Sequence, residues 1–337
     1  MAPHRSNLQV RYVRPPAGRV AENTFELREA PIPRASDGEV VVRNVWLSID
    51  PYQRRQMMEG VRYAQPLRLG DVMVGRTMGR IVESRDPRLR EGDWVRGSLG
   101  WQQYSLARAD EIDPIDPDGI TPSAYLGVLG SSGITAWVGL REIAKIQPRD
   151  TVVVSAAAGA VGSVAGQLAR ATGCRTVGIA GEARKCALAV ADFGYELCLS
   201  HKDPDFADRL AQATPDGIDV DFENVGGIIF DRILARLNDA ARVALCGMVS
   251  QYNLVEPYGM RNIQNLLNRN VMLQGFRVGN YPHCRQAAVQ ELKQRIKAGD
   301  LVFREHIAHG LENAPAAFIG MLEGANIGKQ LVRIADD

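Results

Sequence analysis

The sequence predicts an α/β protein in which a β-rich first part precedes a doubly wound parallel sheet. Up to about residue 120, short apolar runs are broken by Pro, Gly and Asp, a pattern typical of an irregular β domain. From Asp150 onward, apolar strands alternate with helical stretches, which indicates βα units on a parallel sheet. The 337 residues are about twice the length of an average domain, so we expect two domains.

The first part is expected to hold four short strands, at residues 39–46, 79–83, 93–96 and 102–107. Six strands are expected in the second part, at residues 151–155, 175–180, 196–200, 218–223, 241–246 and 271–276. The helices expected between them span residues 161–171, 184–193, 206–213, 228–237 and 257–268. Near the C-terminus, Val289, Leu292 and Ile296 share one helical face that Gly299 would cap, and residues 330–334 alternate as a strand.

Composition and charge argue against several classes of protein. With 45% hydrophobic and 23% charged residues, the chain has the composition of a globular protein. Forty Lys and Arg against 39 Asp and Glu leave a net charge of +1 without a basic tract, so nucleic acid is not expected as a partner. Because no apolar run approaches the ~20 residues of a membrane span and no signal peptide is recognisable, we expect the cytoplasm. The five cysteines form no CxxC pair or cluster, which predicts neither disulfides nor a structural zinc site.

A glycine-containing loop, AAAGAVGS, joins the strand TVVVS to a helix rich in small residues. Ala157 takes the first glycine place of a dinucleotide fingerprint, and Gly159 and Gly162 take the others, with Ala160 and Val161 between them. At such a loop a pyrophosphate approaches backbone N–H groups at a helix N-terminus, where the helix dipole favours an anion. The strand before and the helix after favour a cofactor site over a plain strand-to-helix turn.

The end of the next strand selects between the nicotinamide cofactors. An acidic residue there would bind a ribose 2′-hydroxyl, whereas a cation would receive a 2′-phosphate. In the segment GIAGEARKC (178–186), the small Gly181 stands where the acidic residue is often found, and Arg184 and Lys185 follow. Glu182 instead favours binding of a ribose 2′-hydroxyl. Arg184 and Lys185 could also be solvated residues on an exposed helix face. We expect NADP.

Asn224 follows the fourth strand of the second part, in the segment ENVGG. In open α/β sheets, ligands bind outside the carboxyl ends of the strands. Asn224 is therefore expected either to contact the ribose or nicotinamide, or to cap the next helix.

Several segments together resemble one family. They are SIDPYQRRQM (48–57), EGDWVRG (91–97), GVLGSSGITAW (127–137), AAAGAVGS (156–163), ENVGG (223–227), CGMVSQYN (246–253), MLQGF (272–276) and GANIGKQLVRI (324–334). The chain is similar to zinc-free medium-chain dehydrogenases/reductases of the prostaglandin reductase, leukotriene B4 dehydrogenase and alkenal double-bond reductase group. The resemblance implies a GroES-like domain of residues 1–121 completed by 305–337, a Rossmann domain of residues 122–304, and a homodimer.

The resemblance also implies a set of NADP-binding residues, with Lys185 as the contact to the 2′-phosphate. They are Gly159, Ala160, Val161, Gly162, Arg184, Lys185, His201, Asn224, Cys246, Gly247, Tyr252, Phe276 and Asn326. Two departures stand out. His201 replaces a tyrosine that contacts the phosphate, and Ser131 and Ser132 replace a Met-Pro or Leu-Pro pair near the substrate.

A catalytic zinc ion is not expected. Such an ion needs three protein ligands, and the chain has no cysteine before Cys174. Arg76 and Thr77 stand where the zinc branch of the superfamily has His and Glu. The serines at 131 and 132 lack the strand-to-helix elbow of a hydrolase nucleophile, so hydrolysis is not supported either.

Without zinc, the sequence favours conjugate reduction of an enone or enal. Hydride transfer to the β-carbon leaves charge on an oxygen that a hydrogen-bond donor stabilises. Tyr258 and Tyr252 are the preferred donors, Tyr52 is expected to line the pocket, and Tyr281 and Trp46 are weaker candidates. Each tyrosine could instead be a core aromatic. The alternatives are a quinone reductase with the same cofactor site and a non-catalytic NADPH-binding homologue.

Overall fold

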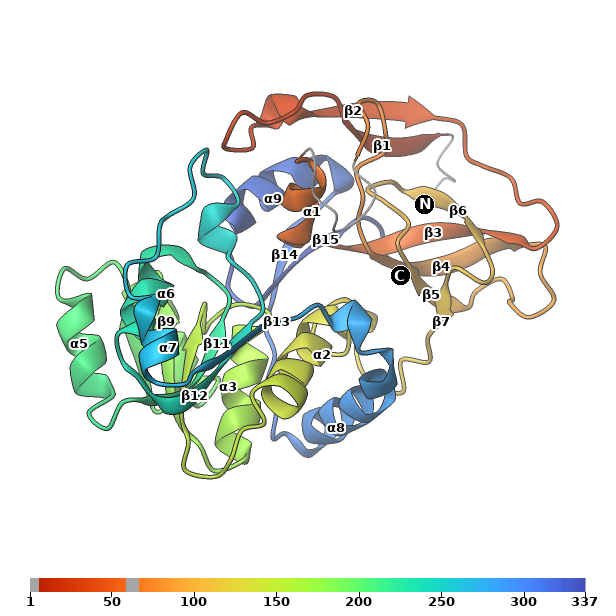
Figure 1. Cartoon of the computed structure of the whole chain (residues 1–337). Coiled ribbons are helices and arrows are strands. Elements are labelled where there is room, and N and C mark those ends of the chain that lie inside the picture. Colours follow the sequence, from red (N-terminus) through yellow and green to blue (C-terminus); the bar gives the residue numbers. More distant parts are fainter. Residues whose placement is uncertain (1–5, 59–66, 337) are drawn as a thin grey trace. The chain divides into compact units, whose positions relative to one another are not determined.

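The computed structural model describes residues 6–58 and 67–336, and it divides the chain into two compact units (Figure 1). Unit 1 comprises residues 1–126 together with residues 305–337, and unit 2 comprises residues 127–304. The C-terminal segment therefore folds with the N-terminal part. In the described part of the chain, no helix has both the length and the apolar character needed to cross a membrane.

Unit 1 is built mainly from antiparallel strands, as the broken apolar pattern predicts. A seven-stranded sheet runs in the order β14-β15-β3-β4-β5-β7, with β6 also paired to β3, while β1 and β2 form a separate antiparallel pair. The strands are β1 (Asn7–Tyr12), β2 (Phe25–Ala30), β3 (Glu39–Ser48), β4 (Thr77–Ser84), β5 (Trp94–Gly97), β6 (Tyr104–Arg108), β7 (Asp113–Pro114), β14 (Glu305–His309) and β15 (Lys329–Arg333). The apolar runs of the sequence predict β3 to β6 and β15, but they do not indicate the other four strands.

The C-terminal segment completes this unit. β15 pairs antiparallel with β3, with Leu331 opposite Ser48, and β14 lies parallel to β15. Figure 1 shows helix α9 (Ala314–Leu322), coloured blue-violet, beside the red N-terminal elements, which include the short helix α1 (Tyr52–Gln56). The Trp101 ring stacks on Phe25 at 5.6 Å and meets Phe318 of α9 edge-on at 5.7 Å. These aromatic contacts fix the C-terminal helix to the first strands.

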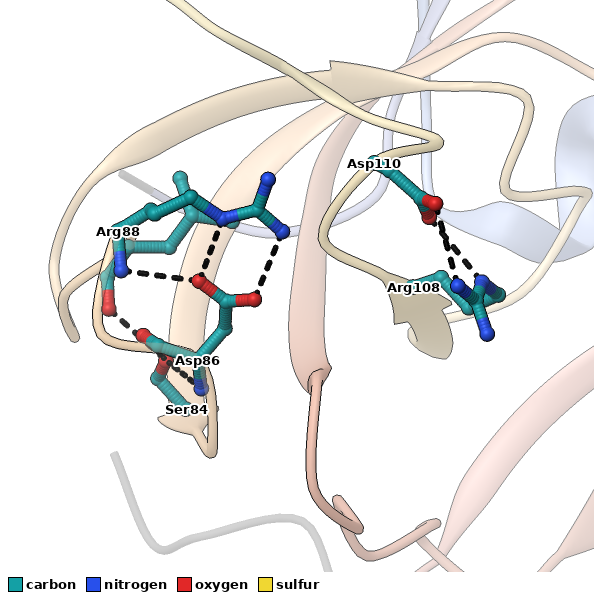
Figure 2. Close-up of polar contacts among 6 residues, drawn as sticks. Ser84, Asp86, Arg88, Arg108 and Asp110 are labelled. Atoms are coloured by element: carbon teal, nitrogen blue, oxygen red, sulfur yellow. Dashed lines mark hydrogen bonds and ion pairs between the residues drawn. The ribbon is translucent and has the colours of Figure 1, made fainter.

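Two short turns at the surface of unit 1 are closed by ion pairs, which Figure 2 shows side by side. After β4, the Asp86 carboxylate accepts hydrogen bonds from Arg88 N and Nε, each at 2.9 Å, and from Arg88 Nη2 at 2.8 Å. After β6, Arg108 donates to both carboxylate oxygens of Asp110 at 3.1 Å. The hydrogen bonds from Arg88 lower the pKa of Asp86 to about 2.

Unit 2 holds a six-stranded parallel sheet in the order β10-β9-β8-β11-β12-β13. Its strands are β8 (Thr151–Ser155), β9 (Arg175–Ala180), β10 (Leu197–Ser200), β11 (Ile218–Glu223), β12 (Leu237–Leu245) and β13 (Met272–Gly275). The chain moves outward from β8 to β10 and then returns to place β11 on the other side of β8. The strand order therefore reverses between β8 and β11, and ligands of doubly wound folds bind at such a point. The predicted fold class, a Rossmann sheet with a β-rich GroES-like domain, is confirmed.

The helices of unit 2 connect these strands and cover the sheet. They are α2 (Ser131–Val138), α3 (Gly162–Ala171), α4 (Ala183–Ala191), α5 (Phe206–Ala213), α6 (Gly227–Leu234), α7 (Gln264–Asn268) and α8 (Arg285–Ala298). Gly299 ends α8 in the left-handed region, at φ 77°, as its position after the apolar helical face predicts. Helix α2 was not predicted, because its Ser-Ser-Gly start resembles a turn.

The helix expected at residues 257–268 is wrong over its first half, because only α7 is helical. Pro257 and Gly259 disfavour a continuous helix. The backbone N–H groups of Arg261 and Asn262 instead donate to Asp231 Oδ1 of α6, each at 2.8 Å. The buried Asp231 carboxylate therefore accepts hydrogen bonds from N–H groups that would otherwise have donated within a helix.

Candidate active site

The loop between β8 and α3 has the tight backbone that a phosphate cradle requires. Ala156 adopts a φ of 52°, and Gly159 N donates to its carbonyl oxygen at 2.8 Å. A β-carbon at Gly162 would lie 2.3 Å from the same oxygen, so no other residue fits there without a shift of the loop. The ten-residue helix α3 begins at Gly162 and directs its N-terminal N–H groups towards this turn.

Close packing behind the loop explains why an alanine is accepted in the first glycine place. Ala157 is fully buried, and its β-carbon would lie 2.8 Å from a β-carbon at Gly178 of β9. The glycine that gives this space therefore stands on the neighbouring strand. Nearby, the buried Tyr195 hydroxyl donates to Gly162 O at 2.6 Å and ties the start of α3 to the segment before β10.

A group of cations surrounds Gly181, at the end of β9. His201 follows β10, and its N–H donates to Ala180 O at 3.0 Å, which fixes the histidine backbone beside this strand end. A β-carbon at position 181 would lie 3.4 Å from His201 Nε2 and 3.9 Å from Lys202 Cε. Lys185 of α4 is half-buried, and Arg184 beside it is exposed. Each of these four residues carries, or gains on protonation, a positive charge.

The electrostatics of this corner suit an anion. Burial lowers the pKa of Lys185, and the neighbouring Lys202 lowers it further, while Glu182 opposes the shift. Burial also lowers the pKa of His201, and Lys202 and Lys185 add to that shift. A phosphate dianion would relieve the repulsion between Lys185 and Lys202 and would favour protonation of His201. Lys202 is not in the set of cofactor-binding residues predicted from the sequence, although it directly follows His201, which is.

A buried network joins the carboxyl ends of β8, β11 and β12. The Glu223 carboxylate is fully buried, and its Oε1 accepts hydrogen bonds from Ser155 Oγ at 2.8 Å, from Gly226 N at 2.7 Å and from Val225 N. The Glu223 carbonyl oxygen accepts N–H bonds from the first two residues after β12, Cys246 at 2.9 Å and Gly247 at 3.0 Å. Sequence analysis missed Ser155 and Glu223, whose contact depends on β8 and β11 being neighbours.

Asn224 is held at the reversal of strand order rather than at a helix cap. Its Nδ2 donates to Ser155 O at 2.7 Å, and its backbone N–H donates to Ser155 Oγ at 2.7 Å. The capping alternative is wrong, because α6 begins at Gly227 after the N-cap Gly226 without a side-chain cap, and the Asn224 amide bonds to Ser155 O instead. The anchored amide of Asn224 lies at the carboxyl edge of the sheet.

The loop after β12 brings Tyr252 to the same edge. Val249 N donates to Asn224 O at 3.1 Å, which ties this loop to the turn after β11. The Tyr252 hydroxyl oxygen accepts a hydrogen bond from Met248 N at 3.4 Å, so this contact does not use the hydroxyl proton. Burial, with a contribution from Glu223, raises the pKa of the Cys246 thiol to about 12, which keeps the thiol protonated.

Tyr258 has a different environment. Its hydroxyl donates to Asp231 Oδ2 at 3.3 Å, and its N–H donates to Gln251 Oε1 at 2.8 Å. Asp231 is itself buried within α6. The hydroxyl proton of Tyr258 is therefore engaged by a carboxylate.

Two further aromatic candidates of unit 2, Phe276 and Tyr281, pack against each other. Phe276, directly after β13, is buried, and its ring meets Phe222 edge-on at 6.3 Å and Tyr281 at 6.5 Å. The Tyr281 hydroxyl accepts a hydrogen bond from Gln274 Nε2 at 3.2 Å. These contacts show how the two rings pack, and a contact of Phe276 with the cofactor stays a prediction.

Unit 1 carries the other candidates. Tyr52 begins α1 under the Arg76 guanidinium, whose carbon lies 5.4 Å from the centre of the tyrosine ring. Thr77 is buried, and its hydroxyl donates to Asn44 Oδ1 at 2.8 Å. Asn326 Nδ2 donates to Gly328 O at 2.8 Å, and Trp46 lies against the Arg333 guanidinium at 5.4 Å. Within residues 6–58 and 67–336, no group of three or more His, Cys, Asp or Glu side chains could hold a metal ion.

Comparison with known proteins gives matches along nearly the whole chain. The profile described as the N-terminal domain of oxidoreductase matches residues 9–115, and the profile described as zinc-binding dehydrogenase matches residues 160–294. The chain is 43% identical over 330 residues to an NADPH-dependent curcumin reductase of Escherichia coli (strain K12), covering 96% of this chain and 95% of the relative. It is 38% identical over 343 residues to an NADP(+)-dependent 2-alkenal reductase of Nicotiana tabacum, covering 99% of each.

A solved structure is equally similar. The crystal structure of CurA from Vibrio vulnificus in complex with NADPH matches with a TM-score of 0.94 at 39% identity, covering 98% of this chain and 100% of that one.

Proposed function

The chain belongs to the medium-chain dehydrogenase/reductase family, in its zinc-independent double-bond reductase group, and from that premise we propose that it uses NADPH to reduce the carbon–carbon double bond of α,β-unsaturated ketones and aldehydes. The observation that carries this proposal is the group of cations around Gly181, beside a glycine loop at the start of α3. Together they fit a dinucleotide with an additional phosphate.

The residues present fit NADPH at each part of the molecule. The α3 N-terminus with Gly159, Ala160, Val161 and Gly162 would hold the pyrophosphate, because the missing β-carbons let backbone N–H groups approach it. Lys185 and His201 would hold the 2′-phosphate. Asn224 and the loop after β12 would hold the ribose and nicotinamide, with Glu223 and Ser155 fixing their backbone. When bound, the cofactor supplies a hydride.

Tyr252 is the donor that we propose for the substrate oxygen. Reduction at the β-carbon leaves negative charge on that oxygen, and a positioned O–H donor stabilises it. Tyr252 lies in the loop that the Val249 N–H ties to Asn224 O at the carboxyl edge of the sheet, whereas the Tyr258 hydroxyl donates to the buried Asp231. Tyr258 is therefore the second choice, and Tyr52 has no assigned chemical step.

Tyr252→Phe and Tyr258→Phe test this assignment in assays of enone-dependent NADPH oxidation. Loss of a positioned oxyanion donor costs about 10²-fold in kcat, so Tyr252→Phe should lose about that much while NADPH binding is unchanged. Tyr258→Phe should instead lower thermal stability and change kcat less than severalfold. Full activity of both single variants and of the double variant would show that neither tyrosine is the donor.

A substrate screen tests the reaction class. Enals, enones and quinones are compared with NADPH as reductant, and the proposal expects the first two to be reduced faster. Faster quinone turnover would identify a quinone reductase, and absence of turnover with every acceptor would identify a non-catalytic NADPH-binding protein.

We also propose a homodimer, which the family resemblance implies, and a cytoplasmic location, which the sequence pattern leads us to expect. Light scattering of the purified protein tests the first, with a monomer mass as the contrary result. Fractionation of cells tests the second, with recovery outside the cytoplasm as the contrary result.

A further inference from the structure

Glu182 and Lys202 form an ion pair beside the cation group at Gly181. Lys202 Nζ lies 3.6 Å from Glu182 Oε1, and the two side chains remain 62% and 57% exposed. An exposed pair of this kind contributes little to folding, so either partner is easily exchanged for another ligand. The pair lies where the second strand of a dinucleotide-binding unit ends.

Glu182 taken alone is unfavourable for NADPH. A carboxylate at this strand end hydrogen-bonds the 2′-hydroxyl of NADH and repels a 2′-phosphate. Lys202 compensates that charge, and its aliphatic chain passes over Gly181, where a β-carbon would lie 3.9 Å from Lys202 Cε. The backbone of this turn is fixed, because His201 N donates to Ala180 O at 3.0 Å and Lys202 N donates to Ser200 Oγ at 3.3 Å.

We propose that Lys202 binds the 2′-phosphate of NADPH by exchanging Glu182 for it, so that this pair sets the preference for NADPH over NADH. The inference rests on the proposed use of NADPH and adds a residue to it. Lys202 supplies the cation, and Glu182 holds the lysine at the site when no phosphate is bound. The repulsion between Lys185 and Lys202 supports this assignment, because a dianion at Gly181 relieves it.

Two nucleotides that differ only in the 2′-phosphate isolate the effect from catalysis. Adenosine 2′,5′-bisphosphate and 5′-AMP are titrated by calorimetry into the full-length protein. Lys202→Ala should weaken bisphosphate binding about tenfold and change 5′-AMP binding less than about twofold, because one charge-assisted contact to the 2′-phosphate is lost. Lys202→Arg keeps the charge and should retain most of the bisphosphate affinity.

Glu182→Gln provides the opposite change. Removing the carboxylate should tighten bisphosphate binding about threefold, because the lysine no longer has a competing partner. Lys297→Ala is the matched control, since Lys297 is also an exposed lysine of unit 2 but lies in α8. The control should leave both nucleotides unaffected.

The outcomes separate this inference from the proposed function. If the unaltered protein binds both nucleotides equally, the assignment of NADPH and the role of Lys202 are both wrong. If the unaltered protein prefers the bisphosphate and Lys202→Ala keeps that preference, only the inference is wrong. Equal weakening of both nucleotides by Lys202→Ala would assign the lysine a structural role and would also overturn it.

Discussion

Units 1 and 2 each bury an aspartate within a strand network, but they compensate its charge differently. In unit 1, Lys329 Nζ of β15 donates to Asp50 Oδ1 at 2.9 Å, and Ser48 Oγ donates to Asp50 Oδ2 at 2.5 Å. Burial alone would raise the pKa of Asp50, but Lys329, Arg76 and Ser48 together lower it. Burial lowers the pKa of Lys329, and the charge and hydrogen bond of Asp50 oppose that shift.

In unit 2, Asp221 of β11 is fully buried without such a partner. Neither of its carboxylate oxygens accepts a hydrogen bond from any residue that the structure describes. Its neighbours on the adjacent strands are Val153 of β8 and Val243 of β12. Burial, and then the nearby Glu223, raise the pKa of Asp221 well above its usual value.

The comparison shows that partners, rather than burial alone, decide what a buried carboxyl group does to stability. Asp50 is charged and paired, so it contributes stability above its unfolded pKa, and this is lost as the pH falls through its lowered folded pKa. Asp221 has a raised folded pKa, so its effect has the opposite sign. Stability is greatest below the unfolded pKa and is lost as the pH rises towards the folded pKa.

Breaking the pair in unit 1 should have the largest effect. Lys329→Met leaves the Asp50 charge buried without its cation and should cost about 3–5 kcal/mol in urea unfolding at pH 7. The double variant Asp50→Asn/Lys329→Met removes both charges and should recover much of that loss. A double variant no more stable than Lys329→Met alone would show that Asp50 does not depend on this lysine.

Removing the carboxyl group of unit 2 should stabilise the protein. Asp221→Val matches the neighbouring valines and should gain about 1–3 kcal/mol at pH 5 by removing an unsatisfied buried group. As the pH rises above the unfolded pKa of an aspartate, about 3.9, the unaltered protein should lose stability relative to the variant, because its folded state keeps a proton that the unfolded state releases. Parallel stability curves for the two proteins would mean that Asp221 is ionised in the folded state.

The smallest effect is expected at the exposed pair of Arg108 and Asp110 in Figure 2. Arg108→Ala removes the side-chain hydrogen bonds to Asp110 from a guanidinium that is 66% exposed. Its melting temperature should change by less than about 2 °C, because surface ion pairs are screened by water and salt. A fall as large as that of Lys329→Met would contradict the distinction between buried and exposed pairs.

The sheet of unit 2 was predictable because buried parallel strands read as continuous apolar runs. The start of β12 was misjudged, since residues 228–237 look helical although α6 ends at Leu234 and Leu237 already pairs with β11. Asp221 also suggests the wrong burial pattern for β11. Its alternation with Val220 and Phe222 suggests an exposed face, but β11 is a central strand with both faces covered.

The candidate site was predictable where one short segment carries it. The glycine loop and Lys185 can be read from the chain because each follows directly from a strand end. The contact between Ser155 and Glu223 could not be read in this way, because it joins residues 68 positions apart that meet only when β8 and β11 become neighbours. Lys202 depends likewise on β10 lying beside β9, which brings it over Gly181.

The proposed activity is tested most directly by following the transferred hydride. The protein is given a simple enone and NADPH that carries deuterium at the transferable position, and the product is analysed by NMR. The account predicts a saturated ketone with deuterium on the carbon β to the carbonyl group. Deuterium on the former carbonyl carbon of an unsaturated alcohol, or no consumption of NADPH with any enone, would contradict it.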